Sequence, residues 1–258
     1  MLWGVNMQLW SFEHFITLVP SFLIMIAIGI VLKLLIGKKS FEIRMIPFKI
    51  VAVILVVIEI LKQVISFIRG YDLYCIPLHF CSLFIFTIPL MAFYRGKYKD
   101  VVFAITPTLC FCLFLFLAIY PCLIYSSDNI LNFFNGFFDF HTVAFHNLVL
   151  FEFVLIFTLK LHKPMKETYI KHLIFFIAVF VIFASTFAQV LKTNYANFYQ
   201  CNVGPVEQFR QYLINVLGYD IAQTLYVFVL SILYILFVMA IHYLYLFIQK
   251  TYYKIVRV

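Results

Sequence analysis

The chain has 258 residues, of which 65% are hydrophobic and only 12% charged, and its mean hydropathy is +1.04. A soluble domain of this length needs far more polar surface, so the composition excludes that class and predicts an all-α, polytopic membrane protein. The net charge of +8 does not indicate a nucleic-acid partner, because no soluble domain is present to carry a basic face.

Seven apolar segments approach or exceed the roughly 20 residues that a helix needs to span a bilayer. In chain order we expect them at residues 14–36, 47–68, 74–94, 100–120, 140–161, 168–190 and 221–248. The alternating pattern of an outer-membrane barrel is absent, which favours helices. No repeat or long linker divides the chain, so residues 1–258 are expected to form a single integral membrane domain. The first 13 residues lack the basic start of a cleaved signal peptide.

The distribution of lysine and arginine predicts the orientation of these helices. Fifteen of them flank the first, third and fifth connections or lie in the C-terminal tail, against three on the other side. Basic residues collect on the cytoplasmic side of a membrane. We therefore expect the N-terminus outside and the C-terminus in the cytoplasm.

Polar side chains gather at one depth in the outer parts of these predicted helices. Cys81 lies six residues after Cys75, or about 9 Å into the third helix. His146 and Asn147 lie about 8–9 Å into the fifth. The shared depth predicts a cavity that is open to the outer leaflet and lined by His14, Gln63, His79, Cys81 and His146. For each residue taken singly, bonding between neighbouring helices remains the alternative.

Two acidic residues fall inside the predicted spans, where an unpaired charge is costly. Glu59 and Lys62 are three residues apart and can pair along one helix face. Glu152 has no local partner, so we expect it to be protonated or bonded to a neighbouring helix.

Cys81 is the candidate nucleophile, because histidines lie at a matching depth. A thiolate needs a base or a cation beside it. His79 is two residues away, about 200° round a helix, so His146 is the better base and His141 the reserve. His79 and Asn147 would then orient the substrate. Pro77 is expected in the first helical turn, where its missing N–H costs little.

A zinc site formed by His14, His79, His146 and Cys81 is the rival use of these residues. The sequence lacks HExxH, CxxC and paired histidines at helical spacing, so no metal is expected. GxSxG, P-loop and GxGxxG motifs are also missing, and no cofactor is expected. A disulfide between two of Cys75, Cys122 and Cys201, which lie at or outside the outer boundary, stays open.

Four stretches resemble YwaF-like integral membrane proteins of bacteria. "IPLHFCSL" resembles the motif that opens their third helix, and "WSFEHFITLV", matching His14, resembles the start of the first. "HTVAFHNLVL" resembles their histidine-led fifth helix, and "LKTNYANFYQC", matching Asn194 and Tyr195, the segment after the sixth. Lys192 stands where the family usually has glycine. The resemblance covers nearly the whole chain.

The resemblance implies a function, because the animal branch of these proteins resembles a phospholipid acyltransferase. There the motif cysteine carries the acyl group and a histidine assists, which points to Cys81 and His146. Substrate contacts would come from His79, Asn147, His14, Gln63 and Asn194. The expected partners are membrane lipids in the cell membrane of an AT-rich bacterium. A lipid hydrolase is a variant, and a non-catalytic binding or transport protein is the alternative.

Overall fold

The computed structural model describes residues 9–162 and 166–256, and within these ranges the chain is helical without a strand. Lys163 and Arg257, which were counted for the orientation, lie outside the described residues. The long helices are α1 (Phe12–Ile36), α2 (Phe41–Ile68), α4 (Lys99–Ile119), α6 (Phe137–Thr158), α7 (Ile170–Leu191) and α9 (Tyr219–Val256). The shorter ones are α3 (Leu83–Phe93), α5 (Ser127–Leu131), α8 (Gly204–Leu217) and the 3₁₀ turns η1 (Leu73–Cys75), η2 (Phe80–Ser82), η3 (Pro121–Leu123), η4 (Glu167–Tyr169) and η5 (Tyr195–Asn197).

Six helices are long and apolar enough to cross a membrane, which confirms six of the predicted segments and makes the chain an integral membrane protein. Their ends lie within a few residues of those predicted, except that α2 begins six residues earlier and α9 ends eight later. The third predicted segment, 74–94, is different. Its apolar helix covers only Phe80–Phe93, about 21 Å of rise against the roughly 30 Å of a bilayer core.

The early start predicted for the third helix is wrong because of the backbone around Pro77. Ile76, which precedes the proline, has φ −58° and ψ 131°, and His79 has φ −82° and ψ 156°. A residue before proline avoids the helical region, so the segment stays extended. Pro77 therefore lies ahead of the helix and not in its first turn.

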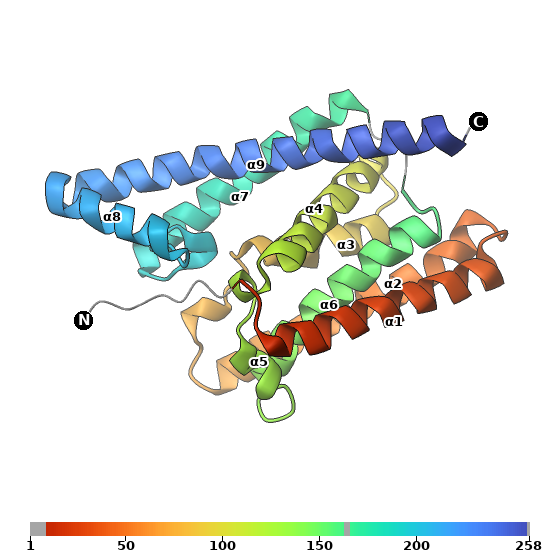
Figure 1. Cartoon of the computed structure of the whole chain (residues 1–258), viewed down its shortest axis with the longest axis horizontal. Helices are drawn as coiled ribbons and strands as arrows, with labels where there is room; N and C mark the ends of the chain where they lie inside the picture. Colours follow the sequence, from red (N-terminus) through yellow and green to blue (C-terminus); the bar gives the residue numbers. More distant parts are fainter. Residues whose placement is uncertain (1–8, 163–165, 257–258) are drawn as a thin grey trace.

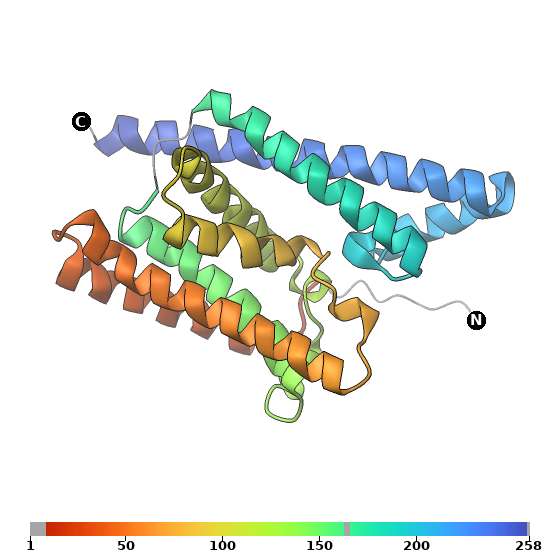
Figure 2. The same ribbon diagram turned by 180° about the vertical axis from the view of Figure 1, so that it is seen from behind.

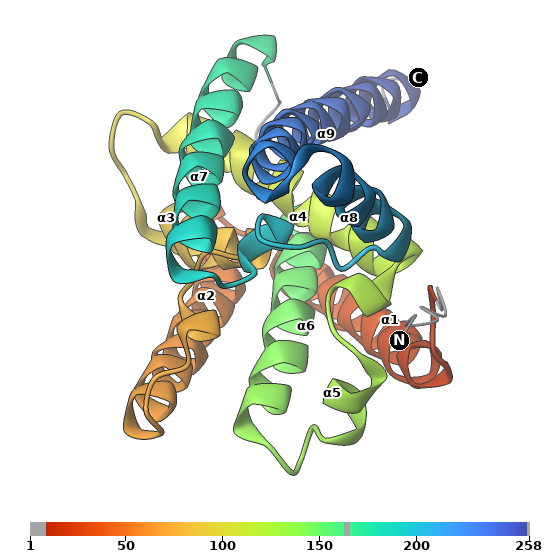
Figure 3. The same ribbon diagram turned by 90° about the vertical axis from the view of Figure 1, so that its left-hand side faces the viewer.

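The helices form two groups with α3 and α4 between them (Figures 1 and 2). On one side α6 packs against both α1 and α2, and on the other α9 packs against both α7 and α8. α4 contacts α6 from the first group and α9 from the second, while α3 contacts α2 and α4. An end-on view places α4 near the middle of the molecule (Figure 3). Much of α1, α2 and α9 exposes leucine, isoleucine and phenylalanine, the surface that a bilayer covers.

Two backbone positions show how closely the helices are fitted. A Cβ atom on Gly29 of α1 would lie 2.8 Å from Cγ1 of Val154 on α6, so the small residue permits the close approach of these helices. Lys192 ends α7 with φ 50° and ψ 38°. This left-handed conformation favours glycine, which accounts for the glycine that resembling proteins carry there.

α8 was not foreseen within the predicted outer connection between α7 and α9. It is amphipathic and is fixed to α9 by Arg210, a buried side chain. Two nitrogens of Arg210 donate to the two carboxylate oxygens of Glu207, at 2.8 and 2.6 Å, and a third donates to Gln223 Oε1 at 2.8 Å. Gln223 in turn donates to the Phe198 and Tyr199 carbonyls. The fork of Arg210 thus joins α8, α9 and the segment after η5.

Acidification should loosen this junction. Burial alone would raise the pKa of Glu207, but hydrogen bonds from Arg210, Cys201 N–H and Gln211 outweigh it and hold the pKa below its usual value. A lowered folded-state pKa gives stability that is present above the unfolded pKa of about 4.3 and is lost as the pH falls through the folded value. We expect Glu207→Gln to flatten the fall in melting temperature below about pH 5. The control is Glu167→Gln, whose carboxylate is 74% exposed in its pair with Lys250; equal pH profiles for wild type and Glu207→Gln would contradict the expectation.

Candidate functional site

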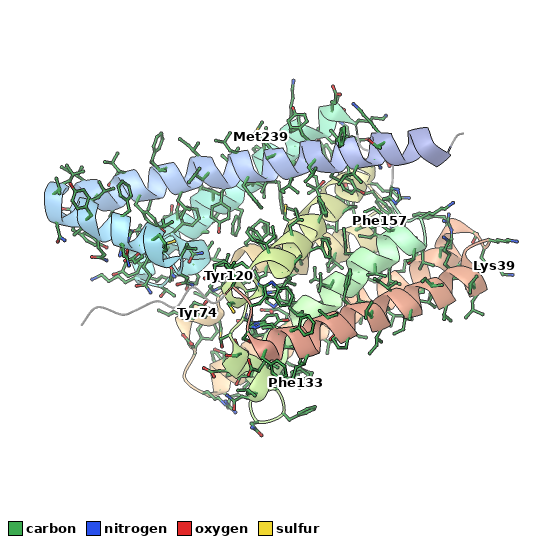
Figure 4. The ribbon with its side chains drawn as sticks, viewed as in Figure 1. Lys39, Tyr74, Tyr120, Phe133, Phe157 and Met239 are labelled. Carbon is green, nitrogen blue, oxygen red and sulfur yellow. The ribbon has the colours of Figure 1, made fainter. Side chains whose placement is uncertain are left out.

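A cavity of about 350 Å³ lies between α2, the segment 72–82, α4, α6, η5 and α9. Its polar lining includes Glu59, Lys62, His79, Cys81, His141 and His146. Aspartate and asparagine side chains add to this lining, among them Asp72, Asp139 and Asn194, and Leu113, Phe116 and Phe145 supply apolar walls. Tyr74, also in the lining, lies near one end of the group formed by α1, α2 and α6, which we call the α1–α6 group. Lys39 lies near the other end of this group (Figure 4).

The segment 72–82 beside the cavity makes only short-range backbone hydrogen bonds, such as Ile76 N–H to the Leu73 carbonyl, and side chains from other elements hold it as well. Gln63 of α2 donates to the Cys75 carbonyl at 2.7 Å and accepts from the Tyr71 hydroxyl at 2.8 Å. Tyr195, a fully buried side chain of η5, donates to the Leu73 carbonyl at 2.5 Å. These bonds from two sides fix the chain as it approaches Cys81.

Cys81 lies in η2, partly buried, between that segment and the start of α3. Phe80 beside it packs against the rings of Phe116, Phe180 and Tyr234, which come from three different helices. Cys81 has no hydrogen bond to a histidine within the described ranges, although His79 and His146 line the same cavity. The thiol is thus placed at the cavity wall by an aromatic cluster.

The hydrogen bonds of the two histidines fix which ring nitrogen carries a proton. A carbonyl oxygen only accepts, so His146 Nδ1–H donates to the Thr142 carbonyl at 2.6 Å. Its Nε2, buried and without a hydrogen-bond partner in the described chain, then carries the lone pair. By the same reasoning His79 Nε2–H donates to the Tyr74 carbonyl at 3.2 Å. His146 Nε2 and His79 Nδ1 are therefore both acceptors.

Glu59 is the centre of the polar network on the α2 side. Its Oε1 accepts from Lys62 at 2.7 Å and from Gln63 at 2.8 Å. Its Oε2 accepts from His141 Nε2 at 2.9 Å, across 82 positions of sequence. The predicted pairing of Glu59 with Lys62 is thus present, and His141 joins it from α6.

Four of the predicted site residues come together at this cavity: His79, Cys81, His146 and Asn194. His14, Gln63 and Asn147 do not line it. Gln63 supports the segment behind the cavity, as described above. Asn147 donates to the Val143 carbonyl one turn earlier and lies in a separate apolar groove between α1, α2 and α6.

His14 is fully buried at the start of α1. Its Nε2 lies 2.8 Å from the Tyr125 carbonyl, and its Nδ1 lies 2.7 Å from the Ser11 hydroxyl. The ring also stacks on Tyr125 at 5.4 Å between centroids. This histidine ties α1 to the connection between α4 and α6.

Several residues of the cavity were not proposed as site residues from the sequence. Glu59 and Lys62 were interpreted only as an ion pair, and His141 only as a reserve base. Asp72 and Asp139 line the same space. Lys62 is the neighbour in sequence of Gln63, which the shared depth assigned to the cavity, and this was the signal available for it. No spacing in the sequence indicates that Glu59 meets His141.

The remaining titratable groups can be placed briefly. Glu152 is fully buried, and neither carboxylate oxygen has a hydrogen-bond partner in the described ranges, which leaves the protonated form of the two expected states. All six cysteines are free, so no pair among Cys75, Cys122 and Cys201 is joined. In the part of the chain that the structure describes, no three histidine, cysteine or acidic side chains are placed to hold a metal ion.

The position of His14 leads to a test of its role. We expect His14→Ala to lower the free energy of unfolding by about 1–3 kcal/mol, because a buried acceptor and hydroxyl lose their partner. Thermal unfolding in detergent measures this. Any chemistry at Cys81, measured per folded molecule, should be unchanged. A stable His14→Ala protein that has lost ligand binding or activity would instead assign His14 to the site.

Comparison with known proteins supplies the family. Neither the curated proteins nor the solved structures give a match to this chain. A sequence model of the TMEM164 family matches residues 9–238, which include every residue that lines the cavity. The match spans well over half of the chain. The protein therefore belongs to the TMEM164 family of transmembrane proteins.

Proposed function

We propose that the protein is a membrane-embedded acyltransferase that moves a fatty acyl chain between lipids through a thioester on Cys81. The observation that carries the proposal is the state of His146. Its Nε2 lone pair has no partner in the described chain and belongs to a ring that lines the same cavity as the only cysteine in the η2 turn. A thiol and an unoccupied base in one partly apolar cavity suit acyl transfer.

The proposed reaction divides into two steps. His146 Nε2 accepts the Cys81 proton, and the sulfur attacks the ester carbonyl carbon of the donor lipid. The C–S bond forms, the ester C–O bond breaks, and the departing oxygen takes the proton from His146. In the second step an acceptor hydroxyl gives its proton to His146 and attacks the thioester. The new C–O bond forms as the C–S bond breaks, and the thiol regains its proton. Water as acceptor would make the same site a hydrolase.

The hydrogen-bonding state of His79 suggests a narrower role than substrate binding in general. Its Nε2–H is already donated to the Tyr74 carbonyl, so only the Nδ1 acceptor is left. An acceptor suits a lipid hydroxyl and cannot donate to a carbonyl or phosphate oxygen. We therefore assign His79 to the acceptor alcohol. Asn194 donates one amide hydrogen to Asn202 Oδ1 and accepts from Gln200 N–H, so its second amide hydrogen is assigned to the carbonyl or headgroup.

A non-catalytic binding or transport protein is the second candidate. It is favoured by the absence of a Cys81–histidine hydrogen bond within the described ranges and by the charged lining from Glu59, Lys62, Asp72 and Asp139. Such a lining suits a polar ligand that enters from one side. In that case Cys81 is a small wall residue.

Both candidates share a proposed topology, with seven crossings, the N-terminus outside and the C-terminus in the cytoplasm. The basic residues support it, because the connection that carries Lys39 lies at the other end of the α1–α6 group from Tyr74 of the cavity (Figure 4). We propose further that this membrane is a bacterial cell membrane, for which the YwaF-like motifs and the composition are the support. A reporter enzyme fused after Val258 should be active only in the cytoplasm, and a fusion after Gly70 should report the outer side. External labelling of the C-terminus would overturn the topology.

The acyl-transfer proposal predicts an adduct. Protein purified with lipid should show a mass increase of one acyl group on Cys81, removable by hydroxylamine. Cys81→Ser should remove the hydroxylamine-sensitive adduct and most lipid turnover. His146→Ala should slow formation of the adduct by about 10²–10⁴, the usual contribution of a general base.

The matched control is Cys110→Ser. Cys110 is a fully buried cysteine of α4 that does not line the cavity, so this variant should keep both adduct and turnover. If folded Cys81→Ser protein keeps the lipid turnover of the wild type, the acyltransferase proposal is wrong. The non-catalytic binding or transport protein is then the better candidate.

A further inference from the structure

We infer that the Lys62 ammonium is the group that stabilises negative charge at the cavity wall, first on the Cys81 sulfur and then on the oxygen of the attacked carbonyl. This inference rests on the proposed function for its second half only. Its first half concerns Cys81 itself and holds for a binding protein as well. Neither the sequence motifs nor the family match assigns a role to Lys62.

Lys62 lines the cavity and is paired there with Glu59. Both oxygens of Glu59 are occupied by donors, from Lys62, Gln63 and His141. The Lys62 side chain is 15% exposed and that of Glu59 only 7%. An ammonium has three N–H donors, and one of those of Lys62 meets Glu59. Both residues of the pair line the cavity, and the Lys62 ammonium has two N–H donors that Glu59 does not use.

Lys62 is the cation among the titratable side chains of the cavity lining in the described ranges. It lines the same cavity as the Cys81 thiol and the rings of His79, His141 and His146. Charges interact more strongly where little water screens them. Of the charged side chains that line the cavity in the described ranges, Glu59, Asp72 and Asp139 are acidic, and Lys62 is the cation. No other lining side chain with a permanent positive charge is available to that sulfur.

The titratable groups that line the cavity with Cys81 come from several elements. Lys62 and Glu59 belong to α2, Tyr74 and His79 to the segment 72–82, and His141 and His146 to α6. Tyr234 of α9 also lines it. The tyrosines are neutral at physiological pH, and His79 and His146 each use one ring N–H on a carbonyl. Lys62 and Glu59, together with Asp72 and Asp139, are therefore the charged groups that contribute to the electrostatic field at the sulfur.

In the acyl-transfer reaction this position has a second use. When the Cys81 sulfur bonds to the ester carbon, the carbonyl electron pair moves onto oxygen and leaves an oxyanion. That charge returns to the carbon as the C–O bond to the leaving alcohol breaks. A cation in the same cavity wall as the attacking sulfur would stabilise both charged states. Lys62 transfers no proton in this step, because the proton moves only from Cys81 to His146 and on to the leaving oxygen.

Alkylation of Cys81 by iodoacetamide tests the first half, because only the thiolate reacts and no lipid is required. The rate at Cys81 is followed by peptide mass spectrometry on the full-length protein between about pH 6 and pH 10. In Lys62→Met the midpoint of the rate–pH profile should move up by about one pH unit, so that the rate below the midpoint falls about tenfold. Lys62→Arg keeps the charge and should stay near the wild type.

Two further variants separate charge from structure. Glu59→Gln removes the opposing carboxylate, so the midpoint should move down, opposite in sign to Lys62→Met. Lys39→Met removes an equal charge at the far end of the α1–α6 group and should leave the profile unchanged (Figure 4). A loss of packing would give shifts of one sign in Lys62→Met, Lys62→Arg and Glu59→Gln. Superimposed profiles of folded wild type and Lys62→Met would overturn the inference.

The second half is tested by the rate of acyl-adduct formation. If the wild type forms the adduct and Lys62→Met forms it at least tenfold more slowly while Lys62→Arg retains the rate, the assignment to the carbonyl oxygen holds. If the wild type never forms an adduct but the alkylation profiles shift as expected, the proposed acyltransferase is wrong and the charge role of Lys62 stands. An adduct that forms equally fast in wild type and Lys62→Met would remove Lys62 from the reaction.

Discussion

The rest of the site depends on the hydrogen bonds that the Glu59 carboxylate accepts from Lys62, Gln63 and His141. A charge this deeply buried in a membrane protein is tolerated only when its oxygens are bonded, and here α2 supplies two donors and α6 the third. The bond to His141 fixes the level of α6 against α2. Gln63, the second donor, also holds the Cys75 carbonyl. One carboxylate thus sets where Lys62, His141 and the segment before Cys81 lie.

The extended segment is the second constraint, and it follows from the solvent. Non-helical backbone at membrane depth survives only where protein or a wetted cavity satisfies its polar groups. Side chains of Gln63 and Tyr195 do so for the Cys75 and Leu73 carbonyls. The same requirement uses one nitrogen of His79 on the Tyr74 carbonyl. The hydrogen bond that holds the Tyr74 carbonyl therefore also determines which nitrogen of His79 is left as an acceptor.

The sequence predicted most of the fold and part of the site. Six spans followed from hydropathy, because length and apolarity alone decide them. The start of the third helix was missed, since Pro77 was compatible with either side of a helix boundary. That error also misplaced His79, because an angle of 100° per residue has no meaning in extended chain. The depth calculation predicted that Cys81, His79 and His146 lie at one level, and in the structure all three line one cavity. It also included His14 and Gln63, because depth carries no information on which way a side chain points.

The short third helix explains why the cavity exists at all. Fourteen helical residues rise about 21 Å, so the third helix does not span about 9 Å of the roughly 30 Å hydrocarbon core. A full-length helix would fill that space with side chains and bury no polar backbone. Instead the chain enters as turns, which pack less regularly and meet η5 and α9 from the other helix group. The cavity is the volume that these turns do not fill, and Cys81 lies where the turns end and α3 begins. Its position at the wall follows from the helix boundary that Pro77 imposes.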